Sequence, residues 1–449
     1  MAVTRPEDSA TDDIRGAAPS AVRRAIANRR PLPGSTEGKN RDTTVDGNEQ
    51  EDESVCRGYS GVLSADSYCD SPRFVRDVLG REPLFREGRS DGEASGETAH
   101  QKETGTGVLS PDDQESWARD PRELTQPIRH PPGVIADSSE RIDQLTLPEP
   151  ASLDADTALE TVRDATEHVF CFDGEQQRAG ASAGLTTSPG AVDAIAFSGG
   201  VDSTLLAAAC PEAALYVGGF EGSHDRQAAT EVAAAMGRDL RVVEFTHETL
   251  VAAIPDVVAA TGRTNPMDVA IAIPLYLVGQ QAAADGADTL GVGQGADELF
   301  GGYAKMADPA TDSRLESNTV RGAQRELVSG LSGQLERDVL TLRAASVEPW
   351  TPFLDDRLIA AALRLPGQLL ATEDRYKIAL RRVADPYVPA EARDAGKKAV
   401  QYGSYVSREL DRLARQAGYK RRIDDHVGKY IRSVVDDAGV TRPSLEEPS

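Results

Sequence analysis

The sequence predicts an α/β protein: a doubly wound parallel sheet, followed by a helical C-terminal part and preceded by a small β-rich N-terminal part. Two observations favour this fold. Between residues 154 and 293, short apolar runs alternate with amphipathic segments, which is typical of parallel strands joined by crossover helices. Glycine-rich segments follow two of these runs, at the strand ends where open α/β sheets bind their ligands.

Apolar spacing predicts the elements in order. Residues 154–170 predict a helix, because apolar side chains recur at helical intervals and Asp154 can cap the first turn. Buried strands are expected at residues 192–197, 214–220, 240–245 and 288–293. Helices are expected between them at residues 202–210, 225–236, 247–260 and 268–284. From residue 313 onward we expect only helices, at residues 314–346, 355–364, 375–384, 404–416 and 421–438.

The first 150 residues are more polar. Residues 1–55 are predicted to be mostly disordered, apart from a short helix at 18–28, because they carry too few apolar side chains to order themselves. Two islands carry more apolar residues. Residues 59–85 predict two strands around a turn at Gly80, and residues 117–137 end in a turn followed by a strand within 130–137, which includes Gly133. The tract 86–115 predicts a disordered insertion, and 138–152 a linker. Three units are therefore expected, at residues 1–55, 56–150 and 151–449.

The charge balance narrows the class of protein. The chain has 49 Lys and Arg residues against 73 Asp and Glu residues, a net charge of −24, which disfavours binding of nucleic acid or membrane through a basic face. We expect no membrane span, because no apolar run reaches about 18 residues, and we expect no secretory signal. The protein is therefore predicted to be cytosolic. Only eight of the basic residues are lysines. This composition favours a halophilic protein, since dense like charge repels little at molar salt; an ordinary acidic mesophilic protein is the alternative.

The four cysteines are Cys56, Cys69, Cys171 and Cys210. No two of them form a Cys-x-x-Cys pair, which argues against a disulfide framework or a structural zinc site.

The first glycine-rich segment reads Ser-Gly-Gly-Val-Asp-Ser, from Ser198 to Ser203, between a predicted strand and a predicted helix. Its two glycines let the backbone approach a ligand closely, and the helix that follows favours an anion at its N-terminus. Asp202 can hold Mg²⁺ beside phosphate oxygens. The segment lacks the lysine of a Walker A loop. A plain strand-to-helix turn is the alternative.

The second segment, residues 291–303, reads Gly-Val-Gly-Gln-Gly-Ala-Asp-Glu-Leu-Phe-Gly-Gly-Tyr and follows the fourth predicted strand. We therefore expect it at the same edge of the sheet as the first segment. Gly293 and Gly295 permit close backbone approach, and Asp297 and Glu298 are adjacent carboxylates suited to Mg²⁺. An N-capped helix with an acidic first turn is the alternative.

Together these two segments resemble the synthetase domain of asparagine synthetases, within the PP-loop ATP-pyrophosphatase superfamily, whose fold is adenine nucleotide alpha-hydrolase-like. The resemblance runs from about residue 154 to about residue 405. The first motif is shared by several PP-loop families, and the second is specific to the asparagine synthetase group. Further matching residues lie at 222–225, 265–269, 352–356, 376–381, 393 and 397–398.

The resemblance implies an ATP- and Mg²⁺-dependent reaction. The aspartate side chain attacks the α-phosphate to give β-aspartyl-AMP and pyrophosphate, and ammonia then displaces AMP. Asp202 and Asp297 are the implied metal ligands. Lys398, or its neighbour Lys397, is implied to neutralise charge that builds on the phosphate. The implied ATP-binding residues are Ser198, Gly199, Gly200, Val201, Asp202, Ser203, Thr204, Gly293 and Gly295.

One catalytic position departs from the family pattern, which often has Glu where this chain has Gln294. A carboxylate there can accept a proton from ammonia, whereas a neutral amide cannot. Proton transfer can instead use Asp297, Glu298 or water. Otherwise the protein makes a different amide or has lost the second step.

The family also carries an N-terminal glutaminase whose nucleophile is a cysteine exposed after removal of Met. Here Ala2 follows Met1, while residues 76–85 and 117–137 resemble strands of that domain. We interpret residues 1–150 as an eroded amidotransferase-like domain. Free ammonia, or ammonia from a separate partner glutaminase, is therefore the expected nitrogen source.

The leading expectation is an asparagine synthetase-type amide ligase acting on ATP, aspartate and ammonia. One alternative is an amide- or lactam-forming ligase of the same fold that acts on another carboxylate. A second is a nucleotide-binding homologue without turnover. A tRNA-modifying enzyme is disfavoured by the net charge. A homodimer is left open as the assembly.

Overall fold

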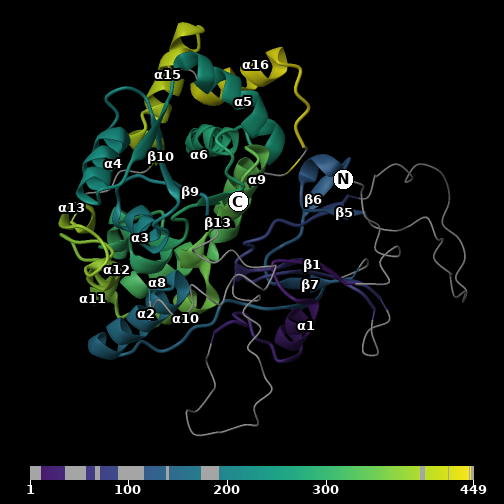
Figure 1. The fold of residues 1–449 in the computed structure, drawn as a ribbon. Helices are drawn as coiled ribbons and strands as arrows, with labels where there is room; N and C mark the ends of the chain where they lie inside the picture. The colour runs from purple at the N-terminus through teal and green to yellow at the C-terminus, as the bar shows by residue number, and fades with distance from the viewer. Residues whose placement is uncertain are drawn as a thin grey trace, which may run out of the picture.

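The computed structural model describes residues 12–35, 57–65, 71–88, 116–137, 141–172, 192–394, 400–422, 424–443 and 445. A large part built on a five-stranded parallel sheet lies beside a smaller part that holds two antiparallel sheets (Figure 1). The predicted fold class is confirmed, with a parallel sheet, a helical C-terminal part and a β-rich N-terminal part.

The parallel sheet has the strand order β11-β10-β9-β12-β13. Its strands are β9 (Ala194–Ala196), β10 (Ala214–Gly219), β11 (Leu240–Glu244), β12 (Thr289–Gly291) and β13 (Glu348–Trp350). Within this sheet β9 comes first along the chain. The strands β10 and β11 are then added on one side of β9, and β12 and β13 on the other. The order therefore reverses between β9 and β12, and open α/β sheets bind ligands at the carboxyl ends of the strands at such a point.

The strand β13 differs from the prediction, which expected only helices after residue 313. It pairs in parallel with β12, with Leu290 opposite Pro349. Three residues that include a proline give no periodic signal. Because β13 is an edge strand, the missing N–H of Pro349 can be tolerated there.

Helices cover both faces of this sheet, as a doubly wound fold requires. Along β10, Leu215 and Val217 enter one core with α3 (Val201–Ala209) and α4 (His224–Ala235). Tyr216, between them, enters the opposite core with α5 (His247–Thr261) and α6 (Pro266–Ala284). Alternate side chains of the strand therefore face opposite helical layers.

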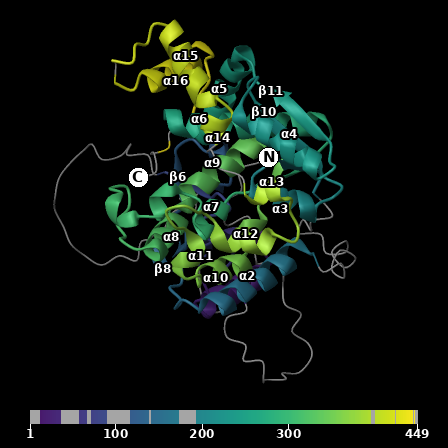
Figure 2. The same cartoon turned by 90° about the vertical axis from the view of Figure 1, so that its left-hand side faces the viewer.

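The C-terminal part is helical, as predicted. The expected helix at residues 314–346 is two helices that meet at Gly330. Figure 2 shows α15 and α16 gathered at one end of the molecule near α5 and α6. The helices are α7 (Ala296–Phe300), α8 (Val320–Ser329), α9 (Leu331–Ala344), α10 (Asp356–Ala362), α11 (Gly367–Leu370), α12 (Ile378–Ala384), α13 (Ala390–Arg393), α14 (Val400–Gly403), α15 (Val406–Gln416) and α16 (His426–Asp437). The preceding helix, α2 (Ala155–Phe170), is capped by Asp154 as predicted.

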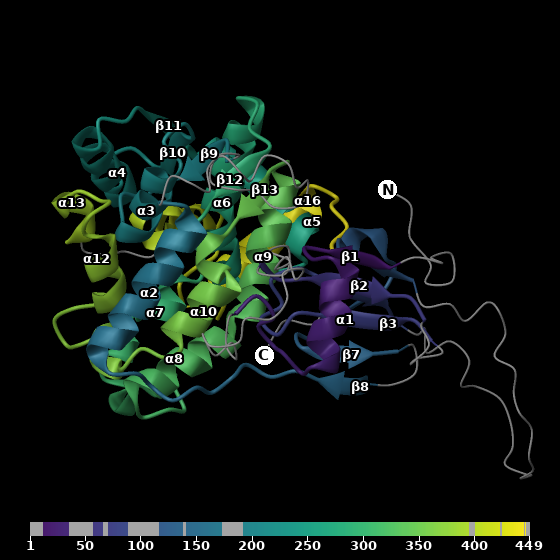
Figure 3. The ribbon, with the colours of Figure 1, turned by 60° about the horizontal axis from the view of Figure 1, so that its bottom comes forward.

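The smaller part contains a sheet with the order β1-β2-β3-β7-β8 and helix α1 (Pro19–Ala27) packed on one face (Figure 3). The strands are β1 (Asp13–Arg15), β2 (Ser60–Leu63), β3 (Arg73–Arg76), β7 (Val134–Ala136) and β8 (Arg141–Gln144). A second sheet has the order β5-β4-β6, with β4 (Phe85–Glu87), β5 (Trp117–Ala118) and β6 (Pro127–Arg129).

Two expectations for this part are corrected by the structure. The expected helix at residues 18–28 is confirmed as α1, whose Val22 is buried together with Val75 and Ile135 of the sheet. The expected disorder is wrong for the flanking residues 12–17 and 29–35, where β1 pairs with β2 and Leu32 is buried. Within the expected linker 138–152 lies β8, which pairs with β7. The predicted turns are confirmed, because Gly80 and Gly133 have φ values of +63° and +70° between strands. Residues 89–115 of the expected insertion lie outside the described residues.

Helix α6 differs from the expectation that no segment has the length and apolarity of a membrane span. Among the described residues it meets both criteria, with 19 residues and a mean hydropathy of 1.2. However, 56% of its apolar stretch is buried inside the protein. Core helices meet the same criteria, so this helix is only a weak indication of a membrane span.

Candidate active site

Two loops meet at the carboxyl edge of the parallel sheet, at the switch point between β9 and β12. Residues 197–200 follow β9, and residues 292–295 follow β12. The loops are so close that a Cβ atom added to Gly293 would lie 3.2 Å from Cβ of Asp202. Both line a cleft of about 1530 Å³, which is the position expected for the two motifs.

The first loop is held by its own hydroxyl groups. Gly199 has a φ of +74°, and a Cβ atom there would lie 2.7 Å from the carbonyl oxygen of Ala228, so only glycine fits. The Ser203 hydroxyl accepts a hydrogen bond from the Ser198 backbone N–H at 3.2 Å. No side chain caps α3, whose first turn is left to bind an anion.

Of the expected ATP-binding residues in this loop, Thr204 is the one that does not line the cleft. It is fully buried, and its hydroxyl donates to the carbonyl oxygen of Gly200 at 2.8 Å. Its hydroxyl therefore supports the loop from behind. The residues at 198–203, including Val201, do line the cleft, as do Gly293 and Gly295.

The second loop brings two adjacent carboxylates, Asp297 and Glu298, to the cleft. Gly295 has a φ of +86°, and a Cβ atom there would lie 2.4 Å from a Leu354 methyl group. Asp297 faces the first loop. Glu298 is buried and accepts a hydrogen bond from the Tyr303 hydroxyl at 2.5 Å. Burial raises the pKa of Glu298, which favours its protonated form.

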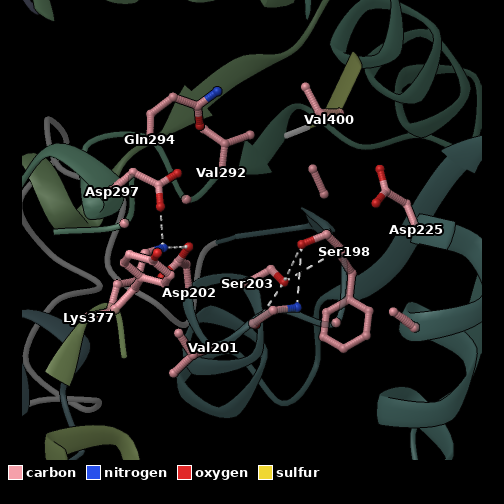
Figure 4. A pocket seen from close by; sticks show the side chains of 18 of the residues that line it. Ser198, Val201, Asp202, Ser203, Asp225, Val292, Gln294, Asp297, Lys377 and Val400 are labelled. Carbon is pink, nitrogen blue, oxygen red and sulfur yellow. Dashed lines mark hydrogen bonds and ion pairs between the residues drawn. The ribbon is translucent and has the colours of Figure 1, made fainter. Parts of the chain in front are cut away.

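Lys377 is the site residue that the sequence analysis missed. Its ammonium group lies between Asp202 and Asp297 and forms an ion pair with both, at 2.6 Å from Oδ1 of Asp297 (Figure 4). The backbone of Lys377 has a φ of +54° at the start of α12, and its N–H donates to the carbonyl oxygen of Gly301. The sequence analysis includes residues 376–381 in the family resemblance but assigns no role to Lys377. The scarcity of lysines in the chain is the signal that could have pointed to it.

The same geometry shows that Asp202 and Asp297 fit a magnesium ion. They come from different loops, yet both contact one ammonium group, so one cation can bind both carboxylates. Mg²⁺ usually takes one or two carboxylates and completes its shell with phosphate oxygens and water. Within the described residues, no group of three or more His, Cys, Asp or Glu side chains could hold a metal ion without such help.

Positive charge faces these carboxylates from α12 and the segment before it. Arg375, Arg381 and Arg382 line the cleft together with Lys377. A cleft lined by guanidinium groups and by an uncapped helix N-terminus is suited to an anion with several charges. The sequence analysis had assigned no role to these arginines.

The two lysines expected to act on the phosphate, Lys397 and Lys398, lie outside the described residues. The flanking residues Arg393, Asp394 and Val400 line the cleft. Gln294 also lines it, on the same side as Asp297, and Asp225 lies on the opposite side (Figure 4). The Gln294 side-chain amide donates to Oδ2 of Asp338 on α9 at 3.3 Å.

The parallel sheet, its switch-point cleft and the two glycine loops that line it define an α/β protein with a candidate ligand site at the carboxyl edge of the sheet. The model of the asparagine synthase family matches residues 194–340 and 312–438, which together are more than half of the 449 residues. The chain therefore belongs to the asparagine synthase family.

Curated relatives agree with this assignment. The chain is 29% identical over 280 residues to a Methanocaldococcus jannaschii protein provisionally named asparagine synthetase 1 (glutamine-hydrolyzing), covering 54% of this chain and 51% of the relative. It is 27% identical over 216 residues to asparagine synthetase B (glutamine-hydrolyzing) of Escherichia coli, covering 44% of this chain and 38% of the relative. The matches therefore span about half or less of these relatives.

Proposed function

We propose that this chain is an ATP-dependent carbon–nitrogen ligase that converts aspartate to asparagine and releases AMP and pyrophosphate. The observation that carries the proposal is the meeting of Asp202 and Asp297, from two loops, at one point of the switch-point cleft. Family membership and the names of the relatives support the choice of aspartate as acceptor.

In the first step, the chain's own residues hold and orient the nucleotide. The glycines of the first loop and the N-terminus of α3 bind the pyrophosphate portion of ATP. Mg²⁺ bound by Asp202 and Asp297 would neutralise phosphate charge. An oxygen of the aspartate side chain bonds to the α-phosphorus, and pyrophosphate leaves with the electron pair of the broken P–O bond.

In the second step, ammonia attacks the acyl carbon of β-aspartyl-AMP. A C–N bond forms, the C–O bond to phosphate breaks, and AMP leaves with its electron pair. One proton must be removed from nitrogen before the neutral amide results. Lys398, with Lys397 as the alternative, is proposed to neutralise charge on the phosphate.

Ammonia is proposed as the direct nitrogen source. Of the described cysteines, Cys171 and Cys210 both belong to the larger part of the molecule rather than to the amidotransferase-like part. Burial raises the pKa of the Cys210 thiol to about 12, which makes it a poor nucleophile. A separate glutaminase that supplies ammonia, a homodimeric assembly and a salt-rich cytosol are further parts of this proposal.

The test measures pyrophosphate release by purified protein in molar KCl with ATP, Mg²⁺ and aspartate, with and without ammonium. Asparagine is assayed in parallel. We expect pyrophosphate release to require aspartate, asparagine to require ammonium, and glutamine alone to fail. Chelation of Mg²⁺ should stop both steps. Pyrophosphate release that is indifferent to aspartate would contradict the proposed acceptor.

A further inference from the structure

Amide formation needs a group that removes a proton from nitrogen, and Gln294 cannot do so because its amide is neutral. Its position is nevertheless informative. The Nε2 atom of Gln294 donates to Oδ2 of Asp338 at 3.3 Å, and both residues line the cleft. Among the described residues, no hydrogen bond reaches the side-chain oxygen of Gln294, which is left to accept one from a substrate.

The other carboxylates near Gln294 are already engaged. Asp202 and Asp297 form ion pairs with Lys377 and are the candidate metal ligands. Glu298 accepts from the Tyr303 hydroxyl, and burial raises its pKa. Asp338 takes part neither in the Lys377 ion pairs nor in the Glu298–Tyr303 hydrogen bond. Within the described part of the chain, it is therefore the carboxylate near Gln294 that is left for proton transfer.

Asp338 is held in place by the residue before it. Nε of Arg337 donates to Oδ1 of Asp338 at 2.8 Å, and the two side chains are only 5% and 8% exposed. Nη1 of Arg337 also donates to Oδ1 of Asp268 at 2.7 Å. Burial alone would lower the pKa of Arg337, but the two carboxylates outweigh it and raise the pKa, so the guanidinium stays charged. One oxygen of Asp338 is thus fixed by Arg337, and the other is directed to Gln294.

The same turn of α9 is braced by the smaller part of the molecule. Glu336 forms ion pairs with Arg129 at 2.6 Å and with Arg76 at 3.6 Å, and both arginines belong to that part. Glu336 is also within 3.4 Å of Arg263, which pairs with Asp268. These buried contacts fix the position of Asp338 at the cleft, which a proton acceptor requires.

We propose that Asp338 is the proton acceptor of the amide-forming step and that Gln294 orients the incoming ammonia. This inference rests on the proposed function. The lone pair of ammonia forms the C–N bond, and a carboxylate oxygen of Asp338 takes one proton from that nitrogen. The C–O bond to phosphate then breaks, and AMP leaves with the electron pair. Asp338 afterwards releases the proton to solvent.

The test compares two readouts in the same preparation of full-length protein. Aspartate-dependent exchange between ATP and labelled pyrophosphate reports the first step, and ammonium-dependent asparagine reports the whole reaction. Asp338→Asn should lower the ratio of asparagine formation to exchange at least about 100-fold, the usual range for loss of a general base. The exchange signal itself shows that the variant folds and binds both substrates.

A second variant keeps the test decisive. Adding Gln294→Glu to Asp338→Asn places a carboxylate at position 294 instead. We expect this double variant to have a ratio of asparagine formation to exchange at least about tenfold higher than that of Asp338→Asn alone. Asp436→Asn changes an exposed carboxylate on α16 and should leave both readouts as in wild type.

The outcomes separate this inference from the proposed function. If wild-type protein makes asparagine and Asp338→Asn keeps the ratio unchanged, Asp338 is not the proton acceptor, although the proposed function stands. If the ratio falls and Gln294→Glu does not recover it, a purely structural role of Asp338 is indicated and the inference fails. If wild-type protein shows no aspartate-dependent exchange, the proposed function fails and the inference fails with it.

Discussion

Two clusters in this protein share one arrangement, a cation between two carboxylates, but they differ in access to solvent. Arg81 lies between Asp77 at 2.8 Å and Asp356 at 2.7 Å, and both carboxylates are 0% exposed. Lys377 lies between Asp202 and Asp297, which are 14% and 16% exposed to the cleft. The first, the enclosed cluster, joins the smaller part of the molecule to Asp356, the first residue of α10. The second, the open cluster, consists of Lys377, Asp202 and Asp297 and lies at the candidate active site.

The two clusters share a charge pattern and differ in their access and in the kind of cation, a guanidinium in the enclosed cluster and an ammonium at the candidate active site. A guanidinium forms several fixed hydrogen bonds, and Arg81 also donates to the carbonyl oxygen of Leu354 at 2.8 Å. A lysine ammonium is a compact charge on a flexible stem and can be replaced by another cation. Carboxylates that reach a cleft can exchange their partner, whereas fully enclosed carboxylates cannot.

The largest effect is expected from Asp202→Ala, which removes one carboxylate of the open cluster. Pyrophosphate release should fall at least about 1000-fold, since a metal ion that is lost from the phosphates withdraws several kcal/mol of stabilisation. The measurement is aspartate-dependent pyrophosphate release at saturating ATP and Mg²⁺. Wild-type rates in this variant would overturn the assignment of the cleft.

The next effect is expected on the enclosed cluster. Arg81→Met leaves Asp77 and Asp356 buried without their shared cation, and the free energy of unfolding should fall by about 3–5 kcal/mol. Denaturant unfolding in molar KCl measures it. Arg23→Met is the matched control, because Arg23 and Asp12 form an ion pair whose side chains are 28% and 21% exposed. That pair should contribute less than about 1 kcal/mol, and equal losses would refute the importance of enclosure.

The enclosed cluster should also make stability depend on pH. Burial raises the pKa of Asp356 to about 7, although Arg81 opposes this. An unfolded Asp has a pKa near 3.9, so the folded protein binds this proton more tightly. The contribution is present in full below about pH 4 and is lost as the pH rises through about 7. Its upper limit is about 4 kcal/mol.

Asp356→Asn removes that dependence, because the amide resembles the protonated acid. The variant should match wild type near pH 4 and be more stable than wild type above pH 7. Denaturant unfolding of both proteins across this range gives the difference. A constant difference between the two proteins would show that Asp356 titrates in the same range in both states.

The two clusters also mark what the sequence could and could not predict. The glycine loops around Asp202 and Asp297 were predictable, because strand, turn and helix follow one another within a few residues. Lys377 joins them from 175 residues beyond Asp202, and no local pattern encodes such a pairing. The same holds for β1, which is ordered by pairing with β2, with Ile14 opposite Gly61. Features formed by neighbouring residues could therefore be predicted from the sequence, whereas contacts between distant segments could not.

The smallest effect is expected from Lys377→Met, and it tests the comparison most directly. Without Mg²⁺, the variant leaves two partly exposed carboxylates facing each other, and the free energy of unfolding should fall by about 1–3 kcal/mol. Because these carboxylates reach the cleft, added Mg²⁺ can bind them and stabilise the folded state by mass action. Mg²⁺ should therefore raise the melting temperature of Lys377→Met more than that of wild type, where the ammonium competes for the same position.

Arg81→Met is the control for this prediction. Mg²⁺ should raise its melting temperature no more than that of wild type, since the ion has no route to Asp77 and Asp356. If Mg²⁺ stabilised both variants equally, access would not distinguish the two clusters.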